Sequence, residues 1–213
     1  MSSCRTWSRW PPGDLTAANF RSLEASKFLL SETDPNRLGP CAAEVTFVGR
    51  SNVGKSTLLN ALCGCKHLAH VSSRPGRTRT INVFDAGKDR WLVDLPGYGF
   101  ATGPKWERDG WEAMITGYLT GRASLRMVFA LIDAEVGPTE LDLRMVEWLK
   151  ANRLPWRAVA TKSDRVKKSR AAARRLEAAG ALDLKPEELA WVCAKEGYGL
   201  GELRNAVLIL LNS

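Results

Sequence analysis

The feature that most constrains the fold of this chain is a glycine-rich loop set between a strand pattern and a helix pattern. Residues 49–56 read GRSNVGKS, two glycines with four residues between them and then Lys-Ser, which is the pattern of a loop that holds nucleotide phosphates. A β-branched and aromatic run at 44–48 precedes it, and Thr57 to Leu62 read as the first turns of a helix. Glycines let backbone N–H groups curl around a polyanion, and a helix N-terminus attracts anions. The order strand, loop, helix therefore predicts nucleotide binding rather than a simple glycine-rich turn.

Individual side chains of this loop have distinct expected roles. Lys55 is expected to place a positive charge on the terminal phosphates, and Ser56 to offer its hydroxyl to Mg²⁺. The predicted nucleotide contacts run along the loop and into the helix: Gly49, Arg50, Ser51, Asn52, Val53, Gly54, Lys55, Ser56 and Thr57.

Length and composition fit one α/β domain. The chain has 213 residues, of which 45% are apolar, enough for one sizeable core and too few for two ordinary domains. No apolar run approaches the roughly 18 residues that a membrane span needs, and the first residues lack the apolar core of a signal peptide. We therefore expect a cytoplasmic protein with no membrane partner.

The cysteines agree with a reducing compartment. There are five, an odd number without framework spacing. Cys63, Cys65, His67 and His70 crowd into eight residues, but this spacing is not a standard tetrahedral zinc set, and we expect a helix end there instead.

Strand and helix patterns alternate along the chain. Strands are expected at 27–30, 44–48, 81–85, 90–94, 127–133, 158–160 and 189–193, and helices at 57–63, 107–120, 139–152, 169–179 and 200–211. This alternation predicts a three-layer α/β fold with a mostly parallel sheet covered by helices on both faces. Residues 1–24 are expected to form a flexible basic arm, residues 25–213 a single domain, and 64–80 a mobile segment within it.

A second motif indicates which base is bound. Thr161, Lys162, Ser163 and Asp164 follow the predicted strand at 158–160, where ligands bind in open α/β sheets. The Asp164 carboxylate can accept from both N1–H and the N2 amino group of guanine, a donor pair that adenine lacks. The aliphatic stem of Lys162 can cover the base plane. The pattern therefore predicts guanine, although a solvated polar turn is the alternative.

A third motif predicts the catalytic metal and the γ-phosphate contact. Asp94, Leu95, Pro96 and Gly97 form a DxxG element after the strand at 90–94. Asp94 is expected to hold Mg²⁺ through water, and the Gly97 N–H to meet the γ-phosphate. The metal set is thus predicted as Ser56, Thr78 and Asp94, and the catalytic set as Lys55, Thr78 and Gly97.

Thr78 belongs to a predicted switch loop. A threonine there can bind Mg²⁺ only when a γ-phosphate is present, so the loop is expected to be ordered with GTP and released with GDP. Its predicted nucleotide contacts are Gly76, Arg77, Thr78, Arg79 and Thr80. A fifth element is expected at Val192, Cys193 and Ala194, where a backbone N–H would meet guanine O6. Cys193 stands where the Ser-Ala-Lys element that is usual in guanine-nucleotide-binding proteins has its serine.

Five elements in this order resemble a translation-factor-class P-loop GTPase, and the finer resemblance is to the EngB (YihA/YsxC) family of ribosome-biogenesis GTPases. It rests on EVTFVGRSNVGKS at 44–56, SRPGRTRTIN at 73–82, DLPGYGFA at 94–101 and DLRMVEWL at 142–149. The family often has Lys where Thr102 stands and Arg where Glu135 stands, so this chain carries less positive charge near the second switch.

The resemblance implies a Ras-like G domain that hydrolyses GTP to GDP and phosphate and assists assembly of the large ribosomal subunit. The family is also linked to normal cell division and septation. Hydrolysis should be slow, because Tyr98 stands where some GTPases have a water-orienting Gln. Asn52 either binds a catalytic K⁺ beside the phosphates, as in some relatives, or only shapes the loop; the ribosomal partner is the other candidate activator.

Charge indicates the kind of partner. The net charge is +8, which suits polyanionic partners, nucleic acid first, but equally an ordinary solvated basic face; the family resemblance favours the former. Two basic clusters are candidates for contacts to rRNA phosphates without sequence specificity. They are Arg74, Arg77 and Arg79 in the switch loop, and Arg165, Lys167, Lys168, Arg170, Arg174 and Arg175 after the guanine motif. We expect the large ribosomal subunit as partner, no DNA sequence recognition, and a monomer.

Two other functions stay open at this point. One is a nucleotide-gated binding module in cell division with negligible catalysis, which the missing Gln after Gly97 would suit. The other is a P-loop ATPase or kinase, which Asp164 disfavours because its carboxylate would be left unpaired by adenine.

Overall fold

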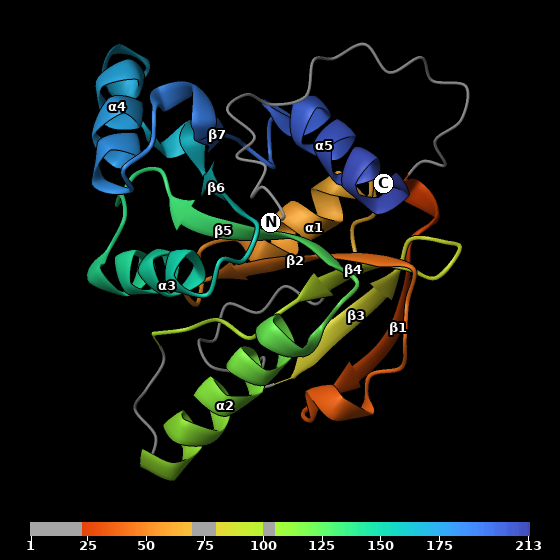
Figure 1. Cartoon of the computed structure of the whole chain (residues 1–213). Coiled ribbons are helices and arrows are strands. Elements are labelled where there is room, and N and C mark those ends of the chain that lie inside the picture. Colours follow the sequence, from red (N-terminus) through yellow and green to blue (C-terminus); the bar gives the residue numbers. More distant parts are fainter. Residues whose placement is uncertain (1–22, 70–79, 100–104) are drawn as a thin grey trace.

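The computed structural model describes residues 23–69, 80–99 and 105–213, except for the side chains of 105–109 and 111. Figure 1 shows the chain as a sheet between two groups of helices. In the described residues, seven strands form one sheet in the order β1-β3-β4-β2-β5-β6-β7. Their bounds are β1 Lys27–Glu32, β2 Ala43–Gly49, β3 Ile81–Asp85, β4 Arg90–Asp94, β5 Leu125–Asp133, β6 Trp156–Thr161 and β7 Ala190–Trp191.

Most neighbouring strands are parallel. The pairs β4–β2, β2–β5, β5–β6 and β6–β7 are parallel, whereas β1–β3 and the hairpin β3–β4 are antiparallel. All seven residues of β2 are buried, as expected for a central strand covered on both faces. The predicted mostly parallel sheet is confirmed.

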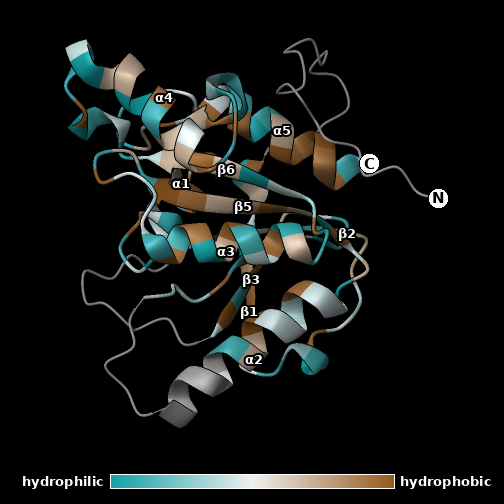
Figure 2. Ribbon diagram, turned by 60° about the vertical axis from the view of Figure 1, so that its left-hand side comes forward, coloured by the Kyte–Doolittle hydropathy of each residue, from teal (hydrophilic) through white to brown (hydrophobic). Residues whose placement is uncertain are grey.

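Helices cover both faces of this sheet. They are α1 Lys55–Leu62, α2 Lys105–Gly121, α3 Glu140–Ala151, α4 Ala171–Ala181 and α5 Leu200–Asn212. One apolar cluster joins α1 and α5 to the sheet, and another joins α2, α3 and α4 to its opposite face. Figure 2 shows hydrophobic and hydrophilic residues alternating along α3, as a helix with one buried side requires. The predicted three-layer α/β architecture is therefore confirmed.

Several predicted bounds differ from the observed ones. β7 has two residues instead of the five expected at 189–193, because the chain leaves the sheet to form the loop at Cys193. α4 begins at Ala171 rather than at 169, since Lys168–Arg170 form a 3₁₀ turn. Leu23, placed in the arm by the sequence, is buried in the α1/α5 cluster. Among the described residues, no helix is both long and apolar enough to cross a bilayer.

A buried ion pair anchors the end of the sheet opposite the phosphate loop. Glu44, the second residue of β2, is fully buried, and its Oε1 lies 2.7 Å from Arg122 Nε. Tyr118 Oη donates to Glu44 Oε2 at 2.8 Å, and Ser124 Oγ to Oε1 at 2.6 Å. The guanidinium of Arg122 also lies over the Trp91 ring. These contacts attach the end of α2 to the first residues of β2.

Candidate nucleotide site

The candidate site lies where parallel strands end. β2, β4, β6 and β7 run in the same direction, so the loops that follow them meet at one edge of the sheet. These loops carry the phosphate-loop, DxxG, guanine and fifth motifs, respectively. The topology of the sheet thus brings together motifs as far apart in the sequence as Gly49 and Ala194.

The phosphate loop has the backbone that its glycines predict. Gly54 has φ +104° and Asn52 φ +64°, so two residues of the loop have left-handed backbone conformations before α1 begins. A Cβ on Gly49 would lie 2.9 Å from Leu131 O and 2.8 Å from the Val53 side chain. Leu58 N donates the first helical bond, to Gly54 O, so the amides of the three preceding residues have no acceptor within α1. They can therefore bind an anion.

Lys55 and Asp94 are a buried pair of opposite charges at the phosphate end. Lys55 is 9% exposed and Asp94 is 3% exposed, and Lys55 Nζ donates to Gly49 O at 3.4 Å. Burial lowers the pKa of Lys55, although Asp94 opposes this. Burial likewise raises the pKa of Asp94 against the influence of Lys55 and Ser56. Both charges are poorly solvated, so each favours a ligand of opposite sign.

The surroundings of Asp94 fit the predicted Mg²⁺. Ser56 Oγ donates to Asp94 Oδ2 at 3.3 Å, which places the two predicted oxygen ligands side by side. Asp94 Oδ1 is buried and has no hydrogen-bond partner among the described residues. A buried carboxylate oxygen without a donor is what a hydrated divalent cation would satisfy. Thr78, the third predicted ligand, lies outside the described residues.

The DxxG segment lies directly on the phosphate loop. Ser51 N donates to Tyr98 O at 3.0 Å, and Tyr98 N donates to Gly49 O at 3.3 Å, which makes a parallel bridge between Arg50 and Tyr98. A Cβ on Gly97 would lie 2.8 Å from Ser51 N. Only glycine permits this approach, and it brings Gly97 close to the loop that would hold the phosphates.

The guanine motif is joined to the phosphate loop by side chains. Lys162 Nζ donates to Asn52 O at 2.6 Å, and Thr161 Oγ1 donates to Val53 O at 2.6 Å. Ser163 N donates to Val192 O at 3.2 Å, which connects the motif to the fifth element. The base end and the phosphate end of the site are therefore held at a fixed spacing.

Asp133 is a site residue that the sequence argument missed. It ends β5, and its Oδ2 lies 2.7 Å from Lys162 Nζ. Burial alone would raise the pKa of Asp133, but Lys162 and the amides of Glu135 and Val136 outweigh it and hold the pKa below its usual range. A signal was present, because an acidic residue follows the apolar strand here as it does at Asp94.

The cysteine in the fifth element contacts the carboxylate that is predicted to bind guanine. Cys193 is buried, and its Sγ–H donates to Asp164 Oδ1 at 3.2 Å. The serine usual at this position would offer a hydroxyl donor instead, so the departure keeps a donor in place. Ala194 follows and is half-buried.

Part of the predicted site lies elsewhere or outside the description. Gly76, Arg77, Thr78 and Arg79 are outside the described residues, whereas Thr80 is described and its Oγ1 donates to Asn82 Oδ1 at 3.2 Å. Cys63 caps α1 and is buried, which raises the pKa of its thiol to about 11. No group of three or more His, Cys, Asp or Glu side chains suited to a metal occurs within the ranges described, which exclude His70.

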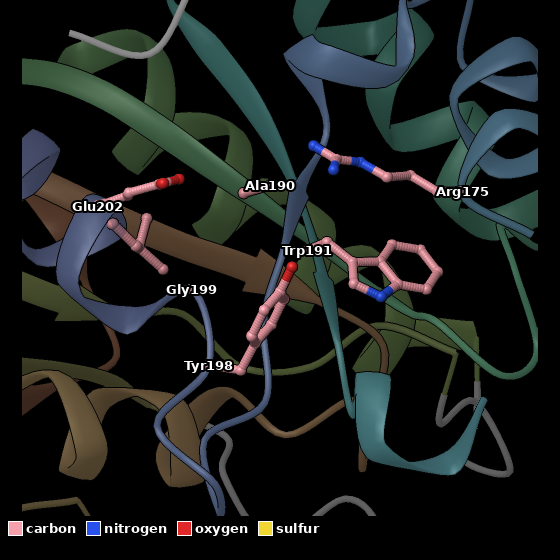
Figure 3. A pocket seen from close by; sticks show the side chains of 7 residues that line it. Arg175, Ala190, Trp191, Tyr198, Gly199 and Glu202 are labelled. Carbon is pink, nitrogen blue, oxygen red and sulfur yellow. The ribbon is translucent and has the colours of Figure 1, made fainter. Parts of the chain in front are cut away.

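A separate cavity of about 190 Å³ lies at the outer edge of β7. Figure 3 shows the side chains that line it, and none of them belongs to the predicted site. They are Arg175, Ala190, Trp191, Tyr198, Gly199, Glu202 and Leu203.

Sequence comparison places this site in a known family. The sequence model of a family described as "50S ribosome-binding GTPase" matches residues 44–162. A "Probable GTP-binding protein EngB" of Myxococcus xanthus (strain DK1622) is 45% identical over 173 residues, which are 78% of this chain and 84% of that protein. The protein of the same name from Thermotoga maritima is 44% identical over 174 residues, 81% of this chain and 88% of that protein.

Comparison with solved structures agrees with the sequence comparison. A crystal structure of a probable GTP-binding protein engB matches with a TM-score of 0.64 and 25% identity, covering 80% of this chain and 99% of that one. Aquifex aeolicus Era bound to GDP.AlF4- matches with a TM-score of 0.60 and 26% identity, covering 79% of this chain and 56% of that one. The predicted P-loop GTPase fold and the predicted family are both confirmed. The chain belongs to the 50S ribosome-binding GTPase family, and within it to the EngB group of GTP-binding proteins.

Proposed function

We propose that this protein is a Mg²⁺-dependent, slowly hydrolysing GTP switch that assists assembly of the large ribosomal subunit in the cytoplasm, with an effect on cell division and septation through ribosome supply. The proposal rests on one observation: the residues expected at the base end and at the phosphate end of a guanine nucleotide lie in one site. At one end Asp164 is oriented by Cys193, and at the other Asp94 keeps an unpartnered oxygen beside Ser56.

The residues present account for binding better than for rapid chemistry. Lys55 and the first-turn amides of α1 can hold the phosphates and offset charge as it develops. Mg²⁺, when bound at Ser56 and near Asp94, would supply Lewis-acid neutralisation of that charge. A group that orients the attacking water is missing at the position after Gly97, because the Tyr98 hydroxyl donates to Asp142 at 2.8 Å. Slow intrinsic turnover follows.

The proposed partner is supported by charge and by the family. The matched family is described as ribosome-binding, and Lys167, Lys168 and Arg170 are exposed after the guanine motif. None of these three side chains has a hydrogen bond or ion pair with another described residue. Arg174 and Arg175 are already engaged, since Arg174 donates to the carbonyls of Glu135 and Val136 and Arg175 to that of Leu189. The first three are therefore the better candidates for rRNA phosphates.

Turnover measured against ribosomal subunits tests the proposal. GTP hydrolysis should be slow for the protein alone and should rise on titration with large, but not small, ribosomal subunits. An absence of stimulation, with tight GTP binding, would instead support the alternative of a nucleotide-gated binding module in cell division. Tyr98 is the feature that favours that alternative, since its hydroxyl is committed to Asp142.

Potassium is a second candidate activator. The Asn52 side chain is exposed and has no hydrogen bond with the described residues, whereas its carbonyl accepts from Lys162. The side chain is thus free to bind a cation beside the phosphates. Turnover in K⁺ should exceed turnover in Na⁺ at equal ionic strength, and equal rates would leave Asn52 with only its role in loop shape.

A further inference from the structure

Asp142 has a buried carboxylate that contacts three neighbouring parts of the protein. It is 1% exposed and lies in the first turn of α3. Its Oδ1 accepts from Tyr98 Oη at 2.8 Å, and its Oδ2 lies 3.5 Å from Arg50 Nε. Thr139 donates to Oδ2 from both its N–H, at 2.8 Å, and its hydroxyl, at 2.7 Å. One side chain therefore touches the phosphate loop, the DxxG segment and α3.

Helix capping explains only half of this arrangement. The capping box of α3 needs Asp142 to accept from Thr139, and Oδ2 alone does that. Oδ1 is turned to a residue 44 positions earlier in the chain. Because a buried carboxylate is costly unless each oxygen has a donor, Tyr98 and Asp142 each hold the other in place.

The backbone of Tyr98 connects this bond to the phosphate end. Tyr98 N and O are both bonded to the phosphate loop, at Gly49 O and Ser51 N, and the residue is 7% exposed. Gly97, immediately before it, packs against Ser51. Gly97 cannot leave this docked position unless Tyr98 moves, and Tyr98 cannot move without breaking its bond to Asp142.

We propose that Asp142 is a positioning residue of the switch: through Tyr98 it holds Gly97 in the docked position, where the Gly97 amide meets a γ-phosphate. The inference rests on the proposed function, because it assumes that Gly97 distinguishes GTP from GDP. It assigns to α3 a share in reading the nucleotide. The adjoining Leu141, which is 40% exposed and would touch a side chain at Gly99, lies where that state can be sensed from outside.

The test compares affinities for GDP and for a non-hydrolysable GTP analogue, both with Mg²⁺, by calorimetry. Tyr98→Phe keeps the ring and removes only the hydroxyl. A hydrogen bond to a charged group is stronger than one between neutral groups, so its loss should weaken docking, and affinity for the GTP analogue should fall about tenfold or more. Affinity for GDP should stay within about twofold. Asp142→Asn should likewise lower the ratio of the affinity for the GTP analogue to the affinity for GDP. The double variant should lower this ratio little further, since both substitutions remove the same interaction.

Thr139→Val is the matched control, because it removes a donor to the same carboxylate but leaves the bond between Tyr98 and Asp142. It should leave the ratio of the two affinities unchanged even if it lowers the melting temperature. A ratio that is unchanged or increased in Tyr98→Phe would overturn the inference. Failure of the unaltered protein to bind either guanine nucleotide would overturn the proposed function instead, so the two failures can be told apart.

Discussion

At the scale of single residues, the carboxylate predicted to bind guanine accepts from a thiol where a hydroxyl is usual, so we expect guanine binding to depend on that thiol. Cys193→Ala removes the donor to Asp164 Oδ1 and leaves the carboxylate free to turn. A thiol is a weak donor, so we assign its hydrogen bond about 1 kcal/mol, and affinity for GDP should fall roughly fivefold. Cys193→Ser should restore it, because the hydroxyl donates in the same place. Calorimetric titration with GDP measures both.

A control separates this effect from general loss of packing. Cys65 is half-buried beside the α1/α5 cluster and does not contact the guanine motif. Cys65→Ala should bind GDP as the unaltered protein does. Equal affinities for Cys193→Ala and Cys193→Ser would contradict the role given to the thiol.

Asp133 provides a pH-dependent prediction. Its pKa is lowered in the folded state, so its pairing with Lys162 stabilises the fold above the ordinary aspartate pKa of about 4 and is lost as the pH falls through the lower folded value. Asp133→Asn should cost about 1–2 kcal/mol of unfolding free energy at pH 7. The difference from the unaltered protein should shrink below pH ~4.

Urea unfolding at neutral pH and at successive acid values measures this difference. Asp183 is a suitable control, because its pair with Lys150 is on the surface and such pairs contribute little. Asp183→Asn should change stability only slightly at every pH. A difference for Asp133→Asn that stayed constant into acid would show that its charge is not what matters.

At the scale of elements, the start of α5 depends on one glycine. Gly199 has φ +71°, and a Cβ there would lie 2.5 Å from Trp191 O. Figure 3 shows Gly199 beside β7. Gly199→Ala should therefore strain the connection between the fifth element and α5 and cost about 2–3 kcal/mol, measured as a fall in melting temperature.

Gly201 offers a control two residues away. It lies inside α5, and a Cβ there would meet nothing within 4 Å. Gly201→Ala should be neutral or stabilise the protein by up to about 1 kcal/mol. A loss in Gly201→Ala equal to that in Gly199→Ala would mean that the close approach to β7 is not the cause.

Elements with strong local patterns could be predicted from the sequence, and elements defined by distant contacts could not. The runs at 81–85 and 90–94 have the bounds of β3 and β4, because alternation and a turn are local. β7 is shorter than its apolar run, because only Ala190 and Trp191 pair with β6. Asp133 and Asp142 were missed as site residues because their partners lie 29 and 44 positions away. From a single sequence one can identify the carboxylate but not the distant donor that it accepts from.

At the scale of the whole molecule, the predicted nucleotide contacts that the structure describes lie along one edge of the sheet. The phosphate end is built from β2 and β4, and the base end from β6 and β7. The exposed cations Lys167, Lys168 and Arg170 follow β6, so they flank the base end. Contact with a polyanion there would leave the region of Gly97 and α3 open to a second partner or to another part of the same ribosomal surface.

The last prediction concerns this basic surface. Each cation that contacts a phosphate releases counterions, and the logarithm of the association constant then falls with the logarithm of salt concentration by about 0.7–0.9 per contact. Changing Lys167, Lys168 and Arg170 together to Gln should reduce that slope by about 2–3 for GTP-loaded protein on large ribosomal subunits. Sedimentation across a salt series measures it.

The matched control changes the same number of cations at the other end of the molecule. Lys27 pairs in register with Asp85 on β3, and Lys88 and Arg153 lie in the turns before β4 and β6, so all three lie at the edge of the sheet opposite the predicted nucleotide site. Their triple change to Gln lowers the net charge equally. If it reduced the salt slope as much, attraction would come from the overall charge of the protein. If only the change of Lys167, Lys168 and Arg170 reduces the salt slope, the protein contacts the ribosomal subunit beside the base end of the site. The nucleotide and the subunit would then bind next to each other, so affinity for the subunit can depend on which nucleotide is bound.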